Sequence, residues 1–456
     1  MTQYTPSPMG WRIGGFLIVA LMTGTTGAQE ALDWESSKYF EYHLGTPSLS
    51  VDGAGRRVVT VAFAVTNPQN GDQPWDIKNA AEFKQPAGAS RLSVNFGWST
   101  TDYQNTGSAG ESLLPVPFRT VGGVASGGGA GVGTSLPVLV DALRQSTPVG
   151  PSAPGWYTIS AVLPAQAAFS GVAMIEGHPA WPHTAAGGSV VWERVPVTSV
   201  HRFFAITDPQ PVPRRQVVDI QRCQACHDGD VHKNVAIPRL SLHGGNRTEN
   251  LDVCVTCHNP NQTDIGYRTS GDEVPMDFKY LIHAIHGAKH RESPLVVVGF
   301  RGALNDFSDV RPPADIRNCY LCHVDRNGKG SFELPLDRAV QGTTLHSGSI
   351  PGVQVDVNPA NDLKMTPTVG ACSACHDDDE TLAHMMSRKT GGSFAALSSD
   401  ISSGRVVERC AECHGPGKKK DVRKVHGARA VSSSGATSRE DREHSSDDDH
   451  DDHDDD

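Results

Sequence analysis

Residues 254–258 read CVTCH, in which two cysteines stand three positions apart and a histidine directly follows the second one. The same pattern occurs five times and accounts for all 10 cysteines of the chain. The copies are Cys223, Cys226 and His227; Cys254, Cys257 and His258; Cys319, Cys322 and His323; Cys372, Cys375 and His376; and Cys410, Cys413 and His414. A repeat this regular indicates that one kind of site is built five times.

A single CxxCH motif is the attachment signature of a c-type haem, in which both thiols bond to the porphyrin and the histidine binds the iron from one side. Disulfides, structural zinc sites and thioredoxin-like redox pairs also use paired cysteines. None of these alternatives gives a reason for a histidine after every second cysteine. The sequence therefore predicts five covalently attached haem c groups.

Each motif supplies one axial ligand, so the second ligand of each iron decides between electron transfer and catalysis at an open iron. Residues 278–290, FKYLIHAIHGAKH, place His283, His286 and His290 on one face of a helix. We predict that His283 and His286 are distal ligands of two neighbouring haems, because one rigid helix would then fix the haem spacing. His290 is predicted to be solvated or to contact a haem propionate. A zinc site or a surface histidine cluster is the alternative for this helix face.

The charge of the chain is concentrated at its C-terminal end. The formal net charge is -11, and the last 18 residues carry -9 of it, so the rest of the chain is nearly neutral. This balance argues against a nucleic-acid-binding role. The segment from Val431 is Ser-rich and then Asp/His-rich, which predicts a disordered tail at 431–456, with weak binding of divalent metals as an alternative.

The N-terminal residues 1–28 have the pattern of a signal peptide. Arg12 precedes an apolar run from Ile13 to Met22, and small residues surround an expected cleavage site near Ala28. An uncleaved anchor is the alternative. No other segment is apolar enough to cross a bilayer, so we expect no transmembrane span in the mature chain. No cysteine lies near the cleavage site to accept a lipid. Export agrees with the haem motifs, because bacteria attach haem c after export.

Residues 29–205 differ in composition from the haem-motif region. They hold six of the seven tryptophans, and apolar residues alternate at Val59, Val61, Phe63 and Val65 and again in RLSVNFGW, 91–98. Such alternation between turn residues predicts an all-β domain, either a sandwich or a split barrel. We place the boundary near PQPVPRR, 209–215, and expect residues 206–430 to be mostly irregular with short helices. The glycine-rich stretch 124–135 lacks the Lys-Ser/Thr of a phosphate loop and is predicted to be flexible.

The order of motifs through the haem region resembles one pentahaem half of the outer-membrane decahaem cytochromes of metal-respiring bacteria, the OmcA/MtrC family. The residues that carry the resemblance are LHGGNR, CVTCHNP, FKYLIHAIHG, VVVGF, CYLCHVDRNG, FELPL, CSACHDD, LAHMM, CAECHGPG and VRKVHG. The resemblance implies five distal ligands for five irons, namely His243, His283, His286, His384 and His426. His232 and His346 lie outside these motifs, and Met365, Met385 and Met386 are less favoured substitute ligands; we expect all five to be surface or packing residues.

The resemblance also implies a function. We expect electrons to pass through five bis-histidine haems, from another cytochrome or an outer-membrane conduit to an external acceptor such as ferric iron, a mineral or a flavin. The β-domain would flank the haems as a docking module or a scaffold. With five haems and no lipidated cysteine, the chain would be a periplasmic or released half-length version, exported by a Gram-negative bacterium.

Two other functions are weighed against this one. The first is a nitrite- or hydroxylamine-converting enzyme with one open haem; such nitrite reductases typically replace one motif histidine with lysine, whereas all five motifs here keep histidine. The second is a subunit of a haem filament. Sharing a ligand between subunits would leave one iron short of a ligand from its own chain, and the histidine count gives no such sign.

Overall fold

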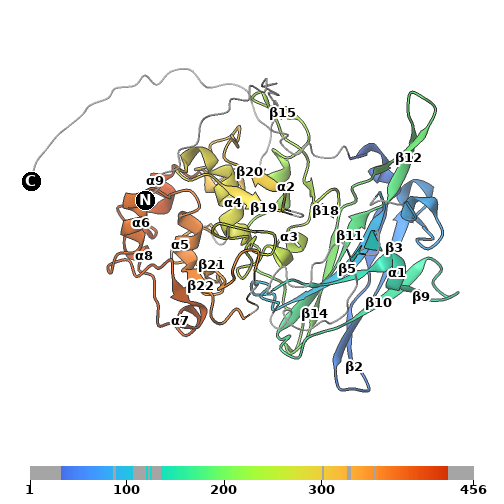
Figure 1. Ribbon diagram of the computed structural model, residues 1–456, viewed down its shortest axis with the longest axis horizontal. Helices are drawn as coiled ribbons and strands as arrows, with labels where there is room; N and C mark the ends of the chain where they lie inside the picture. The colour runs from blue at the N-terminus through green and yellow to red at the C-terminus, as the bar shows by residue number, and fades with distance from the viewer. Residues whose placement is uncertain are drawn as a thin grey trace, which may run out of the picture.

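The computed structural model describes residues 32–85, 89–105, 120–121, 124–125, 135–299, 302–325, 330–353, 356 and 358–429. The predicted signal peptide, residues 126–134 of the glycine-rich stretch and the tail from 431 lie outside these residues. Figure 1 shows the strand-rich part, coloured blue to green, at one side and the later region, coloured yellow to red, at the other.

The first sheet of the strand-rich part is built around one long strand, β3. Val59, Val61, Phe63 and Val65 of β3 are at most 1% exposed, as their alternation predicts. The sheet order is β1-β3-β10-β9, and β2 and β4 also pair with β3. The strands are β1 Glu41–Leu44, β2 Ser48–Val51, β3 Arg57–Asn67, β4 Gln73–Pro74, β9 Thr147–Pro148 and β10 Trp156–Val162.

The second sheet has the order β14-β11-β5-β8, all antiparallel. Its strands are β5 Arg91–Trp98, β8 Val138–Asp141, β11 Ser170–His178 and β14 Val200–Ala205. All nine residues of β11 are buried. Burial of both faces means that this strand has neighbours on two sides: the first sheet on one face and the later region on the other.

The two sheets share one hydrophobic core. It contains Phe63 of β3 and Tyr157 of β10 together with Phe96 of β5 and Ile175 of β11. Neither sheet closes into a barrel among the described strands. Smaller elements surround this core: β6 Thr120–Val121 pairs with β7 Val124–Ala125, β12 Ala180–Thr184 pairs with β13 Val190–Arg194, and short helices lie at η1 Glu35–Tyr39, η2 Pro68–Asn70, η3 Ala81–Phe83 and α1 Ala142–Gln145.

The later region consists of short helices and two- or three-stranded ladders joined by irregular chain, as predicted. Its helices are α2 Ile220–Gln224, α3 Leu251–Cys257, α4 Phe278–His286, η4 Ala288–His290, η6 Cys319–Leu321, α5 Pro367–Cys372, α6 Asp379–Met385, α7 Ser398–Ser402, α8 Ala411–His414 and α9 Val422–Val425. Its strands are β15 Val231–His232, β16 Val235–Ala236, β17 Ser241–Leu242, β18 Arg247–Thr248, β19 Val296–Val298, β20 Leu304–Asp306, β21 Thr343–His346, β22 Leu363–Met365 and β23 Ala396–Leu397. Helices this short are not stable alone, so tertiary contacts must hold them.

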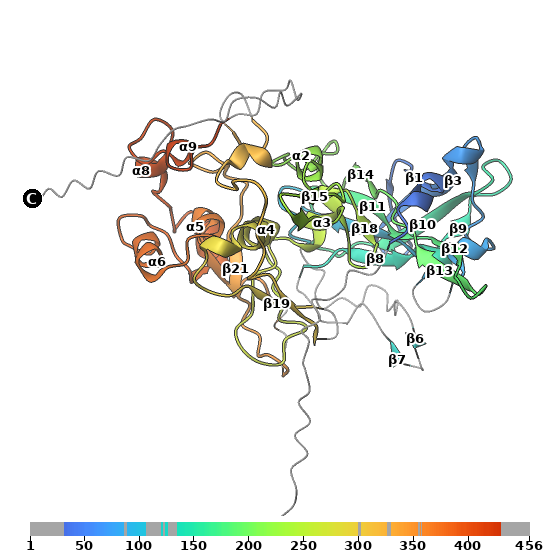
Figure 2. The same cartoon turned by 90° about the horizontal axis from the view of Figure 1, so that it is seen from above.

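The two regions meet along β11, where α3 and the β17–β18 hairpin lie beside the sheet (Figure 2). Val172 and Met174 of β11 pack in one apolar cluster with Val253 and Val255 of α3. The hydroxyl of Tyr103 donates to Asp252 Oδ1 at the start of α3, over 2.7 Å. An apolar cluster with a partly buried hydrogen bond makes this a packed interface rather than a loose linkage between the regions.

Candidate haem-binding sites

The five CxxCH motifs share one backbone hydrogen bond. In each, the histidine N–H donates to the carbonyl oxygen of the first cysteine over 2.8–3.0 Å. Bonds between residues four apart close one helical turn. Residues three and four apart lie on one face of such a turn, so both thiols and the imidazole are presented on the same side. The five bonds join His227 to Cys223, His258 to Cys254, His323 to Cys319, His376 to Cys372 and His414 to Cys410.

In four motifs the Nδ1 atom of the histidine ring is held by a hydrogen-bond acceptor. The acceptors are the carbonyl oxygens of Pro238, Met276 and Lys420 for His227, His258 and His414, at 3.0, 3.1 and 3.1 Å, and Ser331 Oγ for His323, at 2.9 Å. The hydroxyl of Ser331 itself donates to Val217 O, so its oxygen accepts from the ring. These partners assign the proton to Nδ1 and leave Nε2 free to bind a metal.

Each of the five distal candidates lies opposite a different motif histidine. The distances between ring centroids are 6.1 Å for His227 and His286, 5.9 Å for His258 and His243, 5.9 Å for His323 and His283, 6.0 Å for His376 and His426, and 6.2 Å for His414 and His384. Two imidazoles that bind one metal through bonds of about 2.0 Å have their centroids about 6 Å apart. All five spacings therefore fit an iron between the rings.

Helix α4 carries two of the distal candidates, His283 and His286, and they face different motifs. Asp277 caps the helix N-terminus by accepting from Lys279 N over 3.3 Å. The helix ends at Gly287, where an added Cβ would lie only 2.4 Å from Cys375 Sγ. The end of α4 thus lies against the fourth motif while its histidines face the first and third.

The rings of His283 and His323, which face each other, are neutral at pH 7. Burial, and then the neighbouring His286, lower the pKa of His283 to about 4. Burial, and then His283, lower the pKa of His323 to about 3. A neutral imidazole is the form that binds a metal.

The other three distal candidates lie at the ends of short elements. His243 is in the turn of the β17–β18 hairpin with φ of 54°, followed by Gly244 and Gly245 with φ of 71° and 89°. Three successive residues with positive φ explain the two glycines of the LHGG motif, because residues with a side chain rarely adopt this conformation. His384 is in the last turn of α6, and His426 caps the C-terminus of α9.

The remaining candidates of the later region are exposed or contact other side chains. His232 Nε2 lies 2.9 Å from Asp228 Oδ1. His290 is exposed in η4, and His346 is exposed at the end of β21. Met365 is buried and accepts from Ser373 Oγ through its sulfur. None of these side chains belongs to the five ring pairs.

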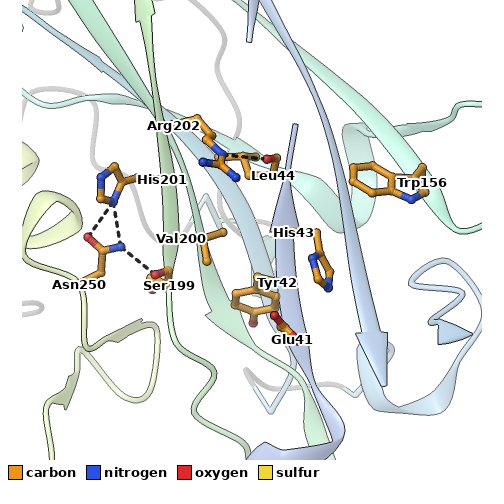
Figure 3. A pocket seen from close by; sticks show the side chains of 10 residues that line it. All are labelled: Glu41, Tyr42, His43, Leu44, Trp156, Ser199, Val200, His201, Arg202 and Asn250. Atoms are coloured by element: carbon orange, nitrogen blue, oxygen red, sulfur yellow. Dashed lines mark hydrogen bonds between the residues drawn. The ribbon is translucent and has the colours of Figure 1, made fainter. Parts of the chain in front are cut away.

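A cavity of about 540 Å³ lies away from the motifs, between β1 and β14 (Figure 3). Its lining includes Tyr42, Trp156 and Arg202, and at one side His201 contacts Asn250, the N-cap of α3. No motif cysteine or histidine and no distal candidate lines it. The cavity is therefore separate from the paired-histidine sites.

Residues 215–427 match the family model of outer membrane cytochrome MtrC/MtrF-like, domains II/IV. The match spans all five motifs and all five distal candidates, and it confirms the resemblance to the OmcA/MtrC family. No curated protein matches the chain. The match supports an exported outer-membrane cytochrome that carries c-type haems and transfers electrons.

The residues present fit the c-type haems of MtrC-like cytochromes. None of the 10 cysteines forms a disulfide, so both sulfurs of each motif can form thioether bonds. The described residues contain no cluster of three or more His, Cys, Asp or Glu side chains that could hold a metal ion. Within the described part of the chain, no helix has the length and apolar character needed to span a membrane.

The sequence did not predict the side chains that connect the His258 and His243 pair to the β-domain. Glu176 of β11 is fully buried and contacts Arg247, which follows His243 by four residues. The sequence does contain a feature that could have predicted this contact: Glu176 is the one acidic residue in the mostly apolar strand SGVAMIEGH. A lone carboxylate in a buried strand requires a cation nearby.

Proposed function

We propose that the chain binds five haem c groups, each through two thioether bonds and two histidines. The single observation that carries this proposal is the set of five ring pairs with centroids 5.9–6.2 Å apart. We number the sites in motif order. The ligand pairs are then His227 and His286 at site 1, His258 and His243 at site 2, His323 and His283 at site 3, His376 and His426 at site 4, and His414 and His384 at site 5.

The contacts between motifs bring sites 1, 3 and 4 close together, which supports a path for electrons through these three sites. Sites 1 and 3 share α4, and the thiols of Cys223 and Cys322 lie within hydrogen-bond reach of one another. Cys375 Sγ of site 4 lies 3.4 Å from His283 O, which brings site 4 against site 3. When bound, each haem supplies an iron that gains and loses one electron. The chain's own part is to hold these groups at fixed, short separations.

Two strong ligands on every iron favour electron transfer over catalysis. We infer that the protein accepts electrons from another cytochrome or an outer-membrane conduit and passes them to ferric iron, a mineral or a flavin, in the periplasm or at the cell surface. An enzyme with an open haem would need a motif histidine without a distal partner. Each of the five has one.

Reoxidation kinetics test this function. The protein reduced under anaerobic conditions is mixed in a stopped-flow instrument with ferric chelates, flavins or mineral suspensions, and haem absorbance is followed. We expect at least one acceptor to reoxidise the haems much faster than buffer. If every acceptor gave the buffer rate while nitrite or hydroxylamine was turned over, the enzyme alternative would replace this proposal.

A further inference from the structure

The hairpin that presents His243 is fixed to the β-domain by the residues that directly follow this histidine. Gly177 N, in β11, donates to Asn246 O over 2.8 Å. Arg194 of β13 donates from Nη1 to Gly244 O over 3.3 Å. Because strands of the β-domain hold the turn at Gly244 and Asn246, site 2 belongs to both regions of the protein.

A buried ion pair completes this attachment. Glu176 Oε2 lies 2.9 Å from Arg247 Nε, and Arg247 Nη2 donates to Glu176 Oε1 over 3.1 Å. The side chain of Glu176 is 0% exposed and that of Arg247 is 14% exposed. Arg91 Nη2 lies 3.7 Å from the same carboxylate, and Ser93 Oγ donates to it over 3.3 Å. One carboxylate therefore faces two guanidinium groups, so the cluster carries a net positive charge.

This cluster lies at site 2. Arg247 begins β18 of the hairpin whose turn carries His243. Glu176 lies in β11, the strand against which Val253 and Val255 pack on either side of Cys254. The ion pair therefore lies between the distal histidine and the attachment motif of one site.

Docking alone does not explain a charge cluster here. Buried ion pairs add little net stability over apolar residues of similar size, because removing both charges from water is costly. The apolar cluster of Tyr103, Val172, Met174, Val253 and Val255 already joins the two regions beside it. We therefore expect the charges of Glu176 and Arg247 to serve a purpose other than holding the two regions together.

We propose that Glu176, acting through Arg247, sets the reduction potential of the haem at site 2. This inference rests on the proposed function. Reduction adds one negative charge to a haem, so a nearby cation favours the reduced form and a nearby anion opposes it. Arg247 raises the potential of this haem, and Glu176 limits the rise. Glu176 acts through Arg247, so it is a positioning residue that the β-domain supplies to the haem at site 2.

The test is a redox titration of the full-length, haem-loaded protein, followed by visible and electron paramagnetic resonance spectra. In Glu176→Gln, one of five components is expected to move to higher potential while four stay in place. In Arg247→Gln, the same component is expected to move to lower potential. The double variant should return close to the wild-type value. A loss of structure alone would not give shifts of opposite sign that cancel.

Asp102→Asn is the matched control, since Asp102 is also buried and lies 3.2 and 3.3 Å from Arg214 and Arg215 near the same boundary. It is expected to leave the site 2 component unchanged. If Glu176→Gln does not fold, Arg91→Gln serves instead, because the Arg91 side chain is 29% exposed and its Nη2 lies 3.7 Å from the Glu176 carboxylate. This variant should lower the same potential.

Two results would overturn the inference without touching the proposed function. One is five unchanged potentials in both single variants that still show low-spin haem. The other is a high-spin signal of one haem in both variants, with shifts of the same sign, which would show that the pair only holds His243 in place. Failure of the proposed function looks different, because the wild-type protein would then lack five low-spin haems.

Discussion

Replacing His286 with alanine should open one haem and leave four unchanged. His286 is the last residue of α4, and its ring centroid lies 6.1 Å from that of His227. Alanine has the highest helix propensity, and the bond that ends the helix, from Gly287 N to His283 O over 2.7 Å, involves no side chain of residue 286. The helix should therefore persist, with His283 still opposite His323.

The size of the effect follows from the ligand count. One of five irons loses its distal ligand, so one fifth of the haem is expected to become high-spin and to bind an added ligand such as carbon monoxide or cyanide. The ring of His286 is partly buried, and its loss should lower the free energy of unfolding by roughly 1–3 kcal/mol. The protein should remain folded and retain all five haems.

Electron paramagnetic resonance of the oxidised protein and a carbon monoxide titration of the reduced protein measure the effect. His290→Ala is the matched control, because His290 lies four residues further along and is exposed. It is expected to stay fully low-spin. His283→Ala should also open one haem, and the double variant of His283 and His286 should open two. If His286→Ala remained fully low-spin, or if His290→Ala opened a haem, the ligand pairing at site 1 would be refuted.

Three further variants test other parts of the structure. Replacing both Cys410 and Cys413 with alanine should lower the mass of the purified chain by one haem and leave four, because each motif attaches its own haem; a mass spectrum with five haems would contradict this. Asn250 caps α3 and donates to Ser199 O over 2.8 Å, so Asn250→Ala should cost about 1–2 kcal/mol in calorimetry, and an unchanged melting temperature would count against the cap. Burial raises the pKa of Asp362 from 3.8 to about 6, so the native state holds this proton more tightly than the unfolded chain does. The contribution of Asp362 to stability should therefore fall as pH rises from about 4 to about 6, by at most about 3 kcal/mol. Asp362→Asn should remove this fall, and calorimetry of both proteins across that pH range would show an unchanged slope if the assignment is wrong.

Features set by local sequence could be predicted. The five helical turns at the motifs follow from the CxxCH spacing, and the buried face of β3 follows from the alternation at Val59, Val61 and Phe63. Placing His283 and His286 on one helix needed only the spacing of three residues. The same spacing argument placed His290 on this helix, but α4 ends with Gly287 as its C-cap. His290 therefore lies outside α4, in the short turn η4.

Features set by contacts between residues far apart in the sequence could not be predicted. Which distal histidine faces which motif depends on contacts such as His376 with His426, which no local pattern encodes. The same holds for the attachment of the His243 hairpin to β11, because Glu176 and Arg247 stand 71 residues apart in the chain. Sheet order has the same limit, since alternation shows which face is buried but not which strand is the neighbour.

The central claim is that five irons each have two histidine ligands from this chain. The most direct test is an electron paramagnetic resonance spectrum of the oxidised protein, recorded together with a haem quantitation on the same sample. We expect five haems for each chain and low-spin signals only. A high-spin signal near one haem equivalent, or fewer than five haems, would contradict the claim and show that at least one ring pair does not hold an iron.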